Sequence, residues 1–132
     1  MFELHPKLAA DTLFVTDWPL CRVLLMNDST YPWLILVPRR PDIAELTDLE
    51  AADQMTLTAE IARASLALRG LVLPHRINIG ALGNVVAQLH VHVIARFTDD
   101  PAWPRPVWGT LPGAPYGEEA QKEALARLRD IL

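Results

Sequence analysis

The sequence predicts an α+β fold with a mainly antiparallel sheet, one long covering helix and a C-terminal helix. Short apolar segments lie on either side of one long amphipathic segment, which favours strands that neighbour one another. No G-x-G-x-x-G follows the first apolar segment, and the βαβ rhythm is absent, so a Rossmann fold is excluded. Residues 88–94 alternate polar and apolar side chains with period two, which is typical of a half-buried strand.

The first half of the chain predicts three strands, at 12–15, 21–26 and 33–37. Residues 27–32 (Asn-Asp-Ser-Thr-Tyr-Pro) have turn chemistry, so the second and third strands are expected to form a hairpin. Pro38 should end the third strand because proline has no N–H to donate to the ladder.

The long helix is predicted to begin at a capping box, with Thr47 as N-cap and Glu50 reaching back to it. Gly70 fits the C′ position, and Pro74 follows soon after. A helix of about 22 residues would be roughly 33 Å long, enough to cover one face of a small sheet. Its apolar residues at helical spacing are Leu57, Ile61, Ala64 and Leu68.

The second half predicts two more strands and a final helix. Residues 76–79 are strand-like, and a glycine-containing turn at 80–84 leads to the strand at 88–94. A segment at 100–109 that is rich in Pro and Trp should be irregular but ordered, since tryptophan side chains need to be buried. Residues 118–132 predict an amphipathic helix with Ala124, Leu125, Leu128 and Ile131 on its apolar face.

Composition favours a single globular domain spanning residues 1–132, of which 51 % are hydrophobic. The net charge of −4 does not suggest an extended basic surface, so no nucleic-acid partner is expected. Cys21 is the single cysteine and is expected to be a buried core thiol. No signal peptide is evident, and no apolar run approaches the ~20 residues of a membrane span. A cytoplasmic protein without a membrane partner is therefore expected.

The strand at 88–94 is the place where we expect chemistry. Gln88, His90 and His92 share one face of it, and the residues between them point into the core.

Three interpretations of these residues are open from their spacing alone. A neutral imidazole is a good nucleophile toward phosphorus, and a neighbouring histidine and amide groups would stabilise the phosphate charge. His-x-His also supplies two ligands for a metal ion. The third interpretation is a pair of structural histidines on a polar sheet face.

Amide side chains near this strand fit a phosphate site. Asn84 falls on the histidine side if the strand is regular that far, and Asn78 belongs to the preceding strand. Amide groups, together with turn N–H groups freed by glycine, suit phosphate oxygens. An ordinary turn residue is the alternative for each asparagine.

From Asn78 to Arg96 the chain resembles the signature of histidine triad (HIT) proteins, which is His-φ-His-φ-His-φ-φ with φ apolar, preceded by a glycine-containing turn. The strand ending at Pro38, the long helix and the Pro- and Trp-rich segment extend the resemblance to residues 13–109. That last segment is similar to a bacterial HIT-like, diadenosine tetraphosphate hydrolase-like subgroup. The resemblance implies a sheet of about five strands and a homodimer.

The resemblance also implies a function, as a nucleotide hydrolase or transferase acting on a dinucleoside polyphosphate or a nucleoside phosphoramidate. His90 would attack the α-phosphate and form a nucleotidyl-histidine intermediate, with His92 contacting the phosphate. Asn84 and Asn78 would take polar roles near the phosphate, and Asn27 is a candidate for holding the ribose. This chemistry implies neither a metal ion nor a cofactor in most branches.

Two positions depart from the family pattern. Gln88 replaces the first histidine of the triad, and it cannot act as an acid near neutral pH. The alternative function is therefore a nucleotide-binding module with little turnover. Trp33 stands where many members have a histidine, and we expect it to pack in the core or to line a base pocket.

Overall fold

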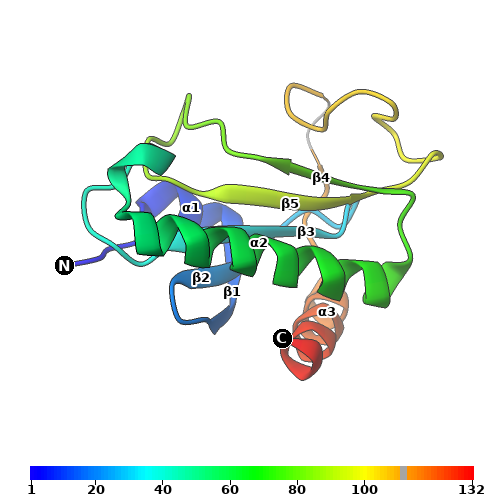
Figure 1. Ribbon diagram of the computed structural model, residues 1–132. Helices are drawn as coiled ribbons and strands as arrows, with labels where there is room; N and C mark the ends of the chain where they lie inside the picture. The colour runs from blue at the N-terminus through cyan, green and yellow to red at the C-terminus, as the bar shows by residue number, and fades with distance from the viewer. Residues whose placement is uncertain (111–112) are drawn as a thin grey trace.

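A computed structural model of the chain describes residues 1–110 and 113–132. One five-stranded antiparallel sheet runs in the order β1-β2-β3-β5-β4 (Figure 1). Its strands are β1 (Thr12–Asp17), β2 (Cys21–Met26), β3 (Trp33–Pro38), β4 (Arg76–Gly80) and β5 (Val91–Arg96). The helices are α1 (Pro6–Asp11), the 3₁₀ turn η1 (Leu46–Asp48), α2 (Ala51–Val72) and α3 (Glu118–Ile131). The predicted α+β fold with its covering helix and C-terminal helix is confirmed.

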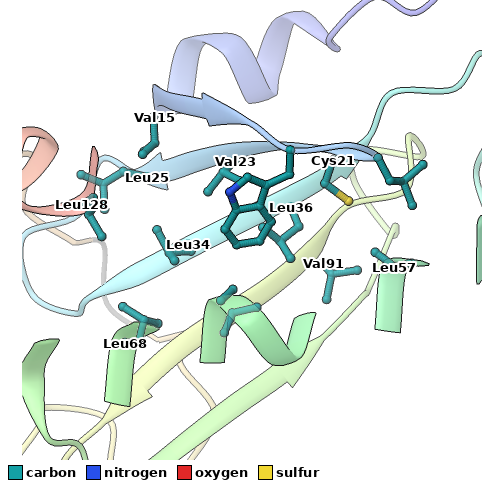
Figure 2. Packing of buried hydrophobic residues seen from close by; sticks show 14 of the residues in the cluster. Val15, Cys21, Val23, Leu25, Leu34, Leu36, Leu57, Leu68, Val91 and Leu128 are labelled. Carbon is teal, nitrogen blue, oxygen red and sulfur yellow. The ribbon is translucent and has the colours of Figure 1, made fainter. Parts of the chain in front are cut away.

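One face of the sheet packs against α2, which crosses it lengthwise in Figure 1, and against α3. Figure 2 shows aliphatic side chains of the strands meeting Leu57 and Leu68 of α2 and Leu128 of α3. Cys21 is fully buried in this layer, as expected, and burial raises the pKa of its thiol. Ile131 differs from its prediction, since it is 45 % exposed at the end of α3.

The opposite face of the sheet is covered by α1 and by irregular chain. Leu8 of α1, Val86, Ala102 and Val107 pack there against alternate residues of the central strands. Both faces of β3 and β5 are therefore buried along their whole length. The histidines were predicted on a half-buried strand, but His90 and His92 are each only 7 % exposed.

Several boundaries differ from the predictions for physical reasons. The capping box is formed by Glu45 and Asp48 around η1, and α2 then starts at Ala51 without a side-chain cap. The helix runs past Gly70, because Leu71 and Val72 still pack on the core. Leu73, in the left-handed region with φ 50°, ends it before Pro74.

The remaining differences lie around the site. The sequence analysis did not anticipate α1, which has Pro6 in its first turn and the His5 ring as its cap. Gly80 is the last residue of β4 and not part of the turn. The predicted strand 88–94 begins only at Val91, so Gln88 and His90 belong to the preceding loop.

A buried ion pair organises the irregular layer. The Arg96 guanidinium, 1 % exposed, donates from Nε and Nη2 to the Asp100 carboxylate at 2.7 and 2.9 Å, and from Nη1 to Asn78 Oδ1 at 2.8 Å. The same carboxylate accepts the backbone N–H groups of Phe97 and Trp103. These hydrogen bonds satisfy backbone N–H groups of the turn in which the chain changes direction after β5.

We predict that Asp100→Asn destabilises the protein by about 3 kcal/mol, because it leaves the Arg96 cation buried without its counter-ion. Hydrogen bonding to Arg96 lowers the pKa of Asp100 to about 2. The stability that the carboxylate contributes is thus present above pH ~4 and lost as the pH falls from ~4 toward 2. Urea unfolding at pH 7 and at pH 3 measures both effects. Asp99→Asn, at the exposed neighbouring position, is the control, and equal midpoints for the two variants would contradict the prediction.

Candidate nucleotide site

A cavity of about 240 Å³ lies on the sheet face that is covered by irregular chain. His90 and His92 line it together with residues from several segments that are distant in sequence. Helix α1 contributes Lys7, Leu8 and Asp11, the 82–86 loop contributes Asn84, and Trp33 and Trp108 complete the wall around His92. The cavity thus brings the predicted nucleophile together with a predicted phosphate contact.

The His90 ring is oriented by the backbone. Its Nδ1 lies 2.7 Å from the carbonyl oxygen of Gln88. A carbonyl oxygen only accepts, so Nδ1 must carry the proton and donate it. In the neutral ring this leaves the lone pair on Nε2, and Nε2 is the nitrogen available for nucleophilic attack.

His92 has the opposite arrangement. The indole Nε1–H of Trp33 donates to His92 Nδ1 at 3.0 Å. An indole N–H can only donate, so Nδ1 holds the lone pair and the proton of the neutral ring sits on Nε2. Burial, together with the nearby His90, lowers the pKa of His92 to about 4. Near neutral pH His92 is therefore an uncharged hydrogen-bond donor.

Aromatic rings enclose His92. The ring centroids of Trp33, Trp108 and His90 lie 5.6, 5.2 and 5.0 Å from that of His92, all in tilted or edge-to-face geometry. Trp108 comes this close because Gly80, the register partner of His92, has no side chain; a Cβ there would stand 2.8 Å from the indole. The apolar surroundings explain why charge on His92 is disfavoured.

Gln88 does not point into this cavity. Its carboxamide Nε2 donates to the carbonyl oxygen of Glu3 at 2.8 Å, and its Oε1 accepts the backbone N–H of His5 at 2.8 Å. This two-bond strap ties the N-terminal segment, and with it α1, to the residue whose carbonyl orients His90. The side chain at the first triad position therefore holds the wall of the cavity.

The other predicted residues divide into two groups. The structure places Asn84 at the cavity, exposed in the loop that follows Gly83, whose φ is +70°. Asn78 lies outside the cavity lining, and its side chain binds Arg96. Asn27 is also outside the lining, and its Oδ1 accepts the backbone N–H of Tyr116. Trp33 both packs in the core, as expected, and lines the cavity.

Sequence reasoning missed two contributions to the site. Lys7 and Asp11 come from the unanticipated α1; the pattern Pro-Lys-Leu-Ala-Ala-Asp, with Pro at the first helical position, was the available signal. The Trp33–His92 hydrogen bond had no local signal, because 59 residues separate the partners.

In the part of the chain that the structure describes, no three His, Cys, Asp or Glu residues are grouped to hold a metal ion. Across the same residues, no helix is both long and apolar enough to cross a membrane.

Comparisons with known proteins agree with this geometry. The family model described as "HIT domain" matches residues 7–99. A crystal structure of a histidine triad protein from Marinobacter aquaeolei is 48 % identical, covers 100 % of this chain and 96 % of its own, and has a TM-score of 0.97. That of a histidine triad protein from Bradyrhizobium japonicum is 46 % identical, covers 98 % and 97 %, and has a TM-score of 0.95.

A curated relative carries a more specific name. The AP-4-A phosphorylase of Mycobacterium tuberculosis is 34 % identical over 82 residues, which cover 53 % of this chain and 40 % of the relative. The match therefore spans less than half of that enzyme's length.

We predict that Gln88→Ala loosens the N-terminal segment without unfolding the sheet. Removing both bonds of the strap should speed amide hydrogen exchange in residues 5–12 by roughly tenfold and leave α2 and β5 protected. Gln54→Ala is the matched control, since the Gln54 side chain also donates to a backbone carbonyl, that of Leu49 just before α2. Unchanged exchange in residues 5–12 of Gln88→Ala would show that the strap does not hold α1.

We also predict that His92 stays neutral down to about pH 4, with its proton on Nε2. The unfolded state takes up this proton near pH ~6.5, so stability declines as the pH falls through the window from ~6.5 to about 4. Imidazole ¹⁵N NMR reports both the titration and the tautomer. Trp33→Phe should remove the preference for the Nε2–H tautomer and cost about 1–2 kcal/mol of stability. A wild-type His92 that titrates near pH 6.5 would refute the prediction.

Proposed function

This chain belongs to the histidine triad family, and we propose that it is a nucleotidyl hydrolase or transferase with His90 as its nucleophile. The substrate would be a dinucleoside polyphosphate or a nucleoside phosphoramidate. The observation that carries the proposal is the hydrogen bond from His90 Nδ1 to the Gln88 carbonyl, which leaves Nε2 free beside the cavity. The curated AP-4-A phosphorylase relative supports nucleotide chemistry of this class.

The reaction has two steps. The His90 Nε2 lone pair attacks the α-phosphorus, so an N–P bond forms and the bond from phosphorus to the leaving group breaks. The ring then carries a positive charge, which the hydrogen bond from Nδ1 to the Gln88 carbonyl stabilises. Water next attacks the same phosphorus and the N–P bond breaks with its electron pair returning to His90 Nε2. The nucleoside monophosphate leaves, the proton of the water is released to solvent, and neutral His90 is restored.

The surrounding donors match the charge of the transferred group. His92 offers its Nε2–H and Asn84 its amide to phosphate oxygens, and neither needs to change protonation state to do so. Lys7 is the cation among the described lining residues, paired with Asp11 at 3.0 Å. In this proposal its ammonium binds the remaining phosphates of a longer chain.

We expect His90→Ala to abolish turnover, because no other described lining residue offers a comparably placed nucleophile. The purified protein is incubated with diadenosine tetraphosphate and with an adenosine phosphoramidate, and products are separated by mass. Brief incubation of the wild type should add one nucleotidyl group to the protein, and His90→Ala should show no such increment. His75→Ala, at an exposed histidine outside the cavity, is the control and should keep full activity.

Two results would change the assignment. Full turnover by His90→Ala would exclude the covalent mechanism. Nucleotide binding without turnover in the wild type would favour the binding-module alternative, in which replacing the first triad histidine with Gln88 has removed catalysis.

A further inference from the structure

The chemistry of the leaving group restricts what this site can cleave. In the first step of the proposed function, the bond from the α-phosphorus breaks and its electron pair goes to the leaving group. A phosphate chain leaves as a stable anion and needs no proton. An alkylamine must receive a proton as the P–N bond breaks, because its anion is far too basic to leave. The site must therefore contain an acid to use the second class of substrate.

The side chain at the first triad position supplies no acid. Gln88 is an amide, and both of its polar atoms are occupied by the backbone of Glu3 and His5. It lies outside the described lining of the cavity. Neither its chemistry nor its direction allows it to protonate a leaving group at His90.

His92 supplies no acid either. Trp33 donates to its Nδ1 at 3.0 Å, and the rings of Trp33 and Trp108 pack against it and leave it largely buried. The ring is therefore neutral with a single proton on Nε2. A neutral imidazole that gave this proton away would become an imidazolate, which is too strong a base to form near neutral pH. His92 can hold a hydrogen bond, but it cannot complete a proton transfer.

Among the residues that the structure describes, the other titratable side chains lining the cavity do not supply the acid either. The His90 Nδ1–H faces the Gln88 carbonyl, on the far side of the ring from the reacting Nε2. The Lys7 ammonium pairs with Asp11, and the Lys7 side chain is 54 % exposed. An alkylammonium is also a poor general acid at neutral pH. The Asp11 carboxylate is held in that pair as the acceptor.

From this arrangement we propose that the site is specific for nucleotidyl compounds whose leaving group departs as a weakly basic anion. The phosphate chain of a dinucleoside polyphosphate is the natural example of such a group. Nucleoside phosphoramidates of alkylamines fall outside this class. The inference rests on the proposed function and narrows its two substrate classes to one.

The test is a series of adenosine 5′-monophosphate derivatives that differ only in the leaving group. The members are diadenosine tetraphosphate, the 4-nitrophenyl ester, the phenyl ester and an alkylamine phosphoramidate. Single-turnover formation of the adenylyl-protein is measured by mass with the full chain, because the second step is common to all four. We expect the rate to fall steeply as the leaving group becomes more basic, and the phosphoramidate to react at least about 100-fold more slowly than diadenosine tetraphosphate.

The outcomes distinguish the His90 mechanism from the restriction on the leaving group. A steep fall with a slow phosphoramidate supports the inference. Similar rates across the series would overturn the inference and leave the His90 mechanism intact, since an acid would then be acting on the leaving group. No adenylyl-protein from any compound, the 4-nitrophenyl ester included, would overturn the proposed function and this inference with it.

Discussion

The buried pairing of Arg96 with Asp100 is the constraint on which the arrangement of the site depends. The central strands β3 and β5 are buried on both faces, so each face needs a cover. Helices α2 and α3 supply one cover, but much of the other is irregular chain, whose backbone polar groups must find partners when buried. Asp100 meets this need by accepting two backbone N–H groups and the Arg96 guanidinium at once. The segment held this way carries Trp108 onto Gly80 and beside His92.

The opposite wall of the cavity is fastened differently. Gln88 uses its carbonyl oxygen to orient the His90 ring and its carboxamide to hold the backbone of Glu3 and His5. One residue therefore couples the orientation of the His90 ring to the position of α1. The Gln88 carboxamide presents an N–H donor and an oxygen acceptor side by side. The two ring nitrogens of a histidine would be placed differently at this position. The departure from the triad pattern is thus compatible with a specific structural role for Gln88.

Local patterns were sufficient to predict much of the sheet and the helices. The strand Cys21–Met26 and the helix near 118–132 follow from apolar runs and helical spacing, and the long helix has the expected length although both of its ends differ. Helix α1 was missed although Pro6 was a local signal for it, because its six residues are held by contacts distant in sequence. Leu8 packs on the sheet, and the Gln88 strap lies more than 80 residues away. Side-chain direction was also unpredictable: Asn78 and Asn27 are drawn to Arg96 and to the backbone of Tyr116 by contacts distant in sequence.

The two histidines of the site show why residue type alone does not define a role. His90 faces a carbonyl oxygen and His92 faces an indole N–H, so the same imidazole is held in opposite tautomers two residues apart. One tautomer exposes a nucleophilic lone pair, and the other presents a proton that is shared but not released. The substitutions at positions 33 and 88 act in the same direction, since a donor-only indole and an amide both remove groups that titrate near neutral pH. In the function that we propose, such a site stabilises phosphate charge by fixed dipoles and depends on the substrate to bring a leaving group that needs no proton.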